Sequence, residues 1–106
     1  MLEDNIKIIK KFGISLHEQG INKRALTEEQ VRSAIKEIEE KDMIVLGGDV
    51  LIKSGNKYEH NYDSWYYNPD KNLSKKDNSS LSISKTIDYL NAYPASSKNY
   101  FILVLQ

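Results

Sequence analysis

Two aspartates and a histidine are the residues of this 106-residue chain whose types and spacing could do chemistry. Asp49 follows a Gly-Gly pair, and His60 and Asp63 lie in an aromatic segment that a hairpin would bring beside it. Paired carboxylates can share acid and base work when their environments separate their pKa values. Carboxylate oxygens also bind hard cations. The sequence therefore leaves open a small metal-binding or hydrolytic domain built on Asp49, His60 and Asp63.

The patterns that would identify a known catalytic mechanism are missing from the sequence. It contains no Gly-x-Ser-x-Gly elbow, no His-Glu-x-x-His helix and no glycine-rich phosphate loop, and its two histidines, His17 and His60, lie far apart. An aspartate at a Gly-Gly corner more commonly accepts backbone hydrogen bonds. We therefore expect that the protein is not an enzyme and that it needs no cofactor and no metal.

The aromatic segment from Tyr58 to Tyr67 can serve the core, a binding surface or both. Alternation places one set of side chains on each face of a strand, and both faces carry aromatic rings. Trp65 fits a small core, yet exposed tyrosine and tryptophan also form binding hot spots. The segment contains no lysine or arginine and the net charge of the chain is zero, which argues against nucleic acid as a partner.

Three amphipathic helices are predicted to support these segments. The best marked begins at the N-cap Thr27, where Gln30 completes a capping box, and runs to about Lys41. The other two follow from apolar residues at helical spacing: Leu2, Ile6 and Ile9 before Gly13, and Ile83, Ile87 and Leu90 before Pro94. Residues 14–24, between the first helix and the helix that begins at Thr27, are polar and predict an irregular connection.

The strands are predicted around the two motifs. An extended run over 43–46 breaks at Gly47-Gly48 and resumes over 50–52, and a Gly-Asn turn within 54–57 leads into the strand at 58–67. A glycine pair permits close approach of a ring such as that of Trp65. Residues 71–80 predict a polar loop, and the apolar run 100–105 predicts a strand in the middle of the sheet.

Together these elements predict a single α+β domain over residues 1–106, a small mixed sheet of three to four strands packed with about three helices. The absence of cysteine excludes disulfides and thiolate sites. The sequence has no apolar run long enough to span a bilayer and no signal-peptide pattern at its start. We therefore expect a cytoplasmic protein with no membrane partner.

The order of these motifs resembles the immunity protein 40 family of bacterial polymorphic toxin systems. The matching residues are Ala25-Leu26-Thr27, the run Leu46-Gly47-Gly48-Asp49-Val50, the run Tyr62-Asp63-Ser64-Trp65-Tyr66 and the closing strand 100–104. The likeness spans about residues 13–105. It departs at Ser64, where asparagine is more usual in the family.

The resemblance implies a protein that binds and inhibits a cognate toxin and does no chemistry. Residues 28–49 contain seven acidic and three basic side chains, which is typical of a solvated helix face and also suits a basic toxin, because opposite potentials speed encounter. The residues expected to contact the partner are Asp49, Asp63, Trp65, Tyr66, Glu37 and Glu40. The sequence leaves the oligomeric state open.

Overall fold

The computed structural model of the protein describes residues 14–15 and 24–106. The predicted helix that begins at Leu2 lies outside these residues. The described elements follow one another along the chain as β1 (Ile14–Ser15), β2 (Arg24–Ala25), α2 (Glu28–Glu40), β3 (Val45–Ser54), β4 (Lys57–Tyr66), α3 (Lys75–Ala92) and β5 (Asn99–Leu105).

The main sheet has the strand order β4-β3-β5, and both pairs are antiparallel. β2 pairs antiparallel with β1, and Leu26, next to β2, exchanges backbone hydrogen bonds of 2.8 and 2.7 Å with Phe101 of β5. The predicted α+β class is confirmed, but the described strands pair antiparallel and not as a mixed sheet.

The central strand is β3, and the prediction that the C-terminal strand lies in the middle is wrong. The hairpin fixes β4 on one edge of β3, which leaves the other edge for β5. Beyond β5, the Leu26 bridge at Phe101 is all that extends the sheet among the described residues. Phe101, Ile102 and Leu103 are nevertheless buried, as expected of a strand covered on both faces, whereas Val104 is 41% exposed.

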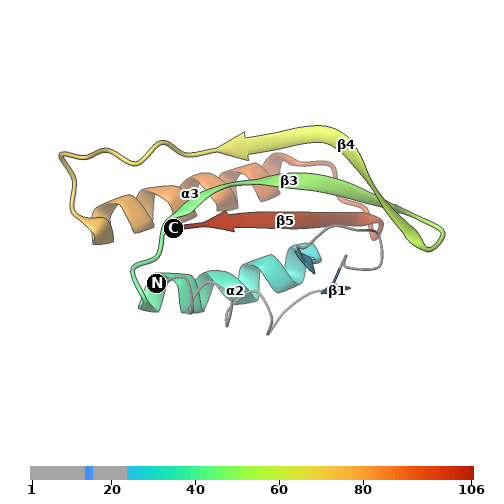
Figure 1. The fold of residues 1–106 in the computed structure, drawn as a ribbon, viewed down its shortest axis with the longest axis horizontal. Helices are drawn as coiled ribbons and strands as arrows, with labels where there is room; N and C mark the ends of the chain where they lie inside the picture. Colours follow the sequence, from blue (N-terminus) through green and yellow to red (C-terminus); the bar gives the residue numbers. More distant parts are fainter. Residues whose placement is uncertain (1–13, 16–23) are drawn as a thin grey trace.

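The two described helices pack on one face of the sheet, with α3 behind β3 and β4 and α2 along β5 (Figure 1). Val50 and its partner Phe101 point to this face and join the helices in the main core. The core residues are Leu26, Val31, Ala34, Ile35, Ile38, Met43, Val45, Val50, Trp65, Ile83, Leu90, Phe101 and Leu103. Side chains at alternate positions of the strands therefore point away from the helices.

The opposite face of the sheet is covered at one end. Leu51 and Ile102 are buried there with Ala25, and Tyr58 and Tyr100 pack against them with ring centroids 4.9 Å apart. This cluster lies toward the β3–β4 turn, where Gly55 adopts the positive φ that the predicted Gly-Asn turn requires. The other end of this face carries Asp49 and is described below.

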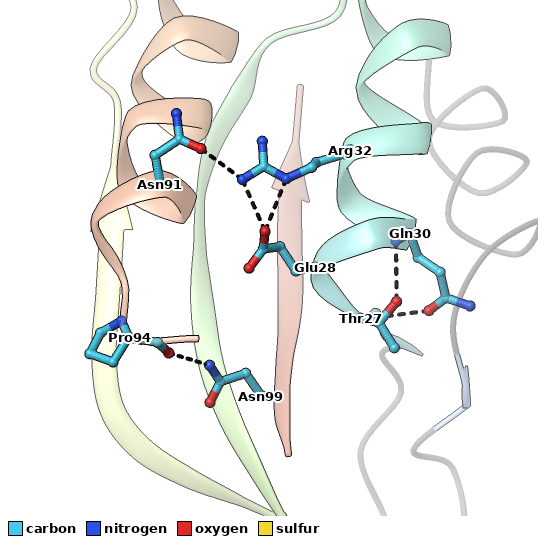
Figure 2. Close-up of polar contacts among 7 residues, drawn as sticks. All are labelled: Thr27, Glu28, Gln30, Arg32, Asn91, Pro94 and Asn99. Atoms are coloured by element: carbon cyan, nitrogen blue, oxygen red, sulfur yellow. Dashed lines mark hydrogen bonds and ion pairs between the residues drawn. The ribbon is translucent and has the colours of Figure 1, made fainter. Parts of the chain in front are cut away.

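The start of α2 is confirmed in detail. Thr27 Oγ1 accepts the backbone N–H of Gln30 at 3.1 Å, and the Gln30 side chain accepts the N–H of Thr27 at 2.9 Å (Figure 2). Figure 2 also shows how α2 is tied to α3: Arg32 pairs with Glu28 at 2.9 Å and donates to Asn91 Oδ1 at 2.8 Å. These contacts hold the helical layer over the sheet.

The helix α3 begins earlier than predicted. Residues 75–80 form its first turns and not part of a polar loop, because Ser74 caps the helix by accepting the N–H of Asp77 at 3.0 Å. Asn78 is buried and binds the preceding segment through Tyr67 Oη at 2.6 Å and the Asp70 N–H at 2.8 Å. The polar composition of this stretch therefore serves capping and buried hydrogen bonds.

Candidate functional site

The glycine pair does not break the strand as predicted. β3 runs continuously from Val45 to Ser54 through Gly47 and Gly48, with a register shift between Val45 and Gly47. A Cβ at Gly48 would overlap the Trp65 ring and lie 2.6 Å from the carbonyl oxygen of Ile102. A Cβ at Gly47, whose φ is +153°, would overlap the backbone of Trp65. Close packing therefore explains both glycines.

Trp65 lies in the core, one of the two roles that its sequence position allowed. Its side chain is only 6% exposed, and its ring stacks on that of Tyr89 with centroids 4.7 Å apart. The indole N–H donates to Thr86 Oγ1 at 3.1 Å, and the Thr86 hydroxyl donates in turn to the Ser82 carbonyl at 2.9 Å. The Trp65 ring would therefore affect the binding of a partner indirectly, by fixing the position of β4.

On the face of the sheet away from the helices, the bare backbone of the glycine pair forms the floor of an open hollow. Its volume is about 270 Å³, and we call it the glycine hollow. It is lined by Leu46, Gly47, Gly48, Asp49, Ser64, Trp65, Tyr66 and Val104. The register places Asp49 opposite both Ser64 and Ile102, so its side chain points to this face.

The rim of the glycine hollow combines one carboxylate with apolar surface. Asp49 is half-buried, and Tyr66 is 66% exposed with the Lys85 ammonium 5.2 Å from its ring centroid. Val104 of β5 supplies aliphatic surface beside them. A carboxylate next to an exposed ring can bind a cationic side chain by charge pairing and cation–π contact together.

A bulge in β4 separates Asp63 from Asp49. Leu51 pairs with His60 and Asp49 with Ser64, so the three residues 61–63 stand opposite Val50 alone. Asn61 Oδ1 accepts the N–H of Asp63 at 3.0 Å and thereby closes the bulge on itself. The simple alternation predicted for residues 58–67 is therefore interrupted.

Tyr93, the C-cap residue that follows α3, holds the bulge. Its phenol donates to Asp63 Oδ2 at 2.7 Å and accepts from Asn61 Nδ2 at 2.6 Å. Burial raises the pKa of Tyr93 above its usual value, and the hydrogen bond to the Asp63 carboxylate raises it further. The Asp63 carboxylate thus already has a partner within the protein.

Tyr62, at the centre of the bulge, was not among the residues that the sequence singled out for a site. Its φ of +68° is rare for a residue other than glycine, and its side chain is 92% exposed. A signal was present, because asparagine and aspartate on either side of one residue favour local turns through their own side chains. The regular alternation of a strand concealed it.

The structure does not assemble the alternative metal or hydrolytic site. Asp63 turns toward Tyr93 on the helical layer, whereas Asp49 and His60 lie on strand positions that point to the other face. Within residues 24–106, no group of three or more histidine, aspartate or glutamate side chains lies close enough to hold a metal ion. The set Asp49, His60 and Asp63 is therefore not a site.

Glu37 and Glu40 lie on α2, apart from the glycine hollow. The apolar stripe of α2 packs on the sheet through Val31, Ala34, Ile35 and Ile38, and α2 lies on the face opposite to the side chain of Asp49. The six residues predicted for partner binding therefore fall into four places: Trp65 in the core, Asp49 and Tyr66 at the hollow, Asp63 in the β4 bulge, and Glu37 and Glu40 on α2.

Comparison with known proteins identifies one family. Residues 15–105 match the family model of immunity protein 40. No curated protein and no solved structure matches the chain. Among the described helices, none combines the length and the apolar character needed to cross a bilayer.

Proposed function

Because the chain belongs to the immunity protein 40 family, we propose that it binds and inhibits one cognate toxin domain of a polymorphic toxin system. It acts in the cytoplasm of the cell that makes the toxin, by binding and not by catalysis. No observation on the described residues favours a second function, since the carboxylate and histidine set that would support one is not assembled.

The glycine hollow is the observation that supports our proposed location for the interface. Within residues 24–106 no side chain hydrogen-bonds or pairs with the Asp49 carboxylate, which sits half-buried beside the exposed ring of Tyr66. A half-buried carboxylate is stabilised when a cation joins it. We therefore assign Asp49 and Tyr66 to the toxin contact, with Asp63 at its border and Trp65 as the core residue that supports the strand.

The acidic surface of α2 supports a basic toxin. Glu40 is exposed and Glu37 half-buried on the helix that lies outside the sheet. This surface is on the other side of the molecule from the hollow. Its negative potential would therefore attract the basic toxin and speed association, without direct contact at the hollow.

Coexpression with the toxin domain encoded by the neighbouring gene tests the function. We expect cells that make both proteins to survive and the two proteins to copurify. Equal killing with and without this protein would show that the proposal is wrong for that toxin.

The variant Asp49→Asn tests the location, with Asp88→Asn on the exposed surface of α3 as the matched control. We expect Asp49→Asn to weaken toxin binding about tenfold or more, as loss of a charge-assisted hydrogen bond does, while Asp88→Asn leaves it unchanged. If both variants bound the toxin as tightly as the wild type does, the glycine hollow would not be part of the interface.

A further inference from the structure

Tyr62 is a large ring presented to solvent on a backbone that does not favour it. The left-handed region brings the Cβ of an L-residue close to the neighbouring carbonyl oxygen, so a tyrosine persists there only when its surroundings hold it. Here the ring gains no burial in return, since 92% of the residue is exposed. The fold alone therefore does not explain a tyrosine at this position.

The residues on both sides of Tyr62 fix its conformation. Asn61 and Asp63 each bind the phenol of Tyr93, at 2.6 and 2.7 Å, and Asn61 also binds the Asp63 backbone at 3.0 Å. Tyr93 is itself packed against Phe101, with ring centroids 6.2 Å apart. The backbone of the bulge is thus attached to the core at the end of α3, so this backbone does not have to be ordered when the Tyr62 ring is bound.

We infer that Tyr62 anchors the interface with the toxin, as an exposed ring on a fixed backbone that enters an apolar slot rimmed by basic side chains. The inference rests on the proposed function and adds to it the residue that carries most affinity. Tyrosine fits this part, because it buries a large area, loses few rotamers and keeps a hydroxyl for one polar contact.

The charges beside the ring favour a toxin over a second copy of this chain. The exposed acidic residues Glu59 and Asp63 lie within three positions of it in the chain, and the segment 58–67 contains no lysine or arginine. A two-fold contact through this bulge would bring like charges together, which is unfavourable, whereas basic side chains at the rim of a slot would meet them favourably.

Substitution of Tyr62 separates binding from folding. Tyr62→Gly removes the ring and suits the positive φ, and Tyr62→Asn removes the ring with a residue that tolerates this region. With the purified toxin domain of the neighbouring gene as the probe, we expect both variants to lose at least about tenfold in affinity. We expect Tyr62→Phe to retain most of it.

Unfolding midpoints give the second measurement. Tyr62→Gly should unfold at a temperature equal to or above that of Tyr62→Ala, because alanine keeps a Cβ in the left-handed region. Leu81→Ala, at a half-exposed apolar position of α3, serves as the control and should bind as the wild type does. Wild-type affinity in Tyr62→Gly and Tyr62→Asn overturns the inference and leaves the proposed function standing.

A double-mutant cycle tests the role of Tyr93 as a positioning residue. Tyr93→Phe removes both hydrogen bonds to the bulge and should weaken binding by less than Tyr62→Gly does. In the Tyr62→Gly background it should cost no further affinity, because there is no ring left to position. Equal losses in both backgrounds would contradict the positioning role, and a wild-type protein that does not bind the toxin would remove both proposals together.

Discussion

At the scale of single residues, Gly47 and Gly48 let β3 pack closely against Trp65 of β4, because a Cβ at either position would overlap that residue. Gly48 lies under the ring of Trp65, and a Cβ there would meet both this ring and the Ile102 carbonyl oxygen, the latter at 2.6 Å. Gly48, whose missing Cβ would point to the core face, also lines the glycine hollow through its backbone. One residue without a side chain therefore belongs to both the core packing and the candidate interface.

Gly48→Ala should accordingly destabilise the fold. The added methyl group must displace the indole ring or the β5 backbone, and overpacking of this kind costs about 1–3 kcal/mol. Chemical denaturation followed by tryptophan fluorescence measures the loss. Ser84→Ala, at an exposed position of α3, is the control; a similar loss in both variants would contradict the explanation.

Tyrosine ionisation should limit stability at high pH. Burial raises the pKa of Tyr58, Tyr89 and Tyr93 above the usual value of 10.0. The folded state therefore keeps these protons to higher pH than the unfolded state does, so their contribution is complete below about pH 10 and is lost as the pH rises through the folded pKa values.

The measurement is the free energy of unfolding between pH 8 and pH 11 in the wild type and in Tyr93→Phe. The decline with pH should be shallower in the variant, because one of the ionising groups is gone. Tyr62→Phe, at an exposed position, is the comparison and should follow the wild-type curve. If the free energy of unfolding fell equally steeply with pH in all three proteins, Tyr93 would not contribute to the decline.

At the scale of elements, local signals predicted α2 and missed the start of α3. The capping box at Thr27 acts over three residues and needs no distant contact, so the sequence shows it directly. α3 instead buries Asn78, Ser79, Ser82 and Thr86. Two of them have partners far away in the sequence: the Val45 N–H donates to Ser82 Oγ at 2.9 Å, and the Trp65 indole N–H donates to Thr86 Oγ1 at 3.1 Å. A polar composition with such partners resembles a loop until the fold is known.

The N-cap of α2 should contribute measurably to stability. Thr27→Ala removes the acceptor for the Gln30 N–H and should lower the free energy of unfolding by about 1 kcal/mol. Thr27→Ser keeps the hydroxyl and should stay near the wild type. Thermal or urea unfolding distinguishes them, and an equal effect of both substitutions would mean that packing of the methyl group, and not capping, is what matters.

At the scale of the whole molecule, the sequence indicated the fold class but not the order of the strands. The apolar run at 100–105 predicts burial and does not specify which strand it will join, because that depends on the edge left free by the β3–β4 hairpin. The sequence predicted only part of the candidate site, again because strand pairing decides which side chains lie together. Asp49 and Tyr66 do line one hollow, whereas Tyr62 depends on a bulge that only the register reveals.

The acidic surface of α2 gives a prediction at this scale. Replacing Glu37 and Glu40 together by glutamine should slow association with a basic toxin several-fold at low ionic strength and change the dissociation rate little, because the effect acts through the long-range field. Association rates at several salt concentrations measure it. A change confined to dissociation would instead place these residues in direct contact with the toxin.

The length of the β4 bulge has a consequence for how such a protein can change its specificity. Three residues stand opposite one, so the strand carries two extra residues, an even number, and His60 and Ser64 remain on the same face. Removing two residues, Tyr62 and Asp63, should leave Trp65 in the core, with its fluorescence emission still blue-shifted. Removing one should turn the rest of the strand over and expose the indole. Evolution can therefore lengthen or shorten this segment in steps of two, and so alter what it presents to a toxin, without rebuilding the core beneath it.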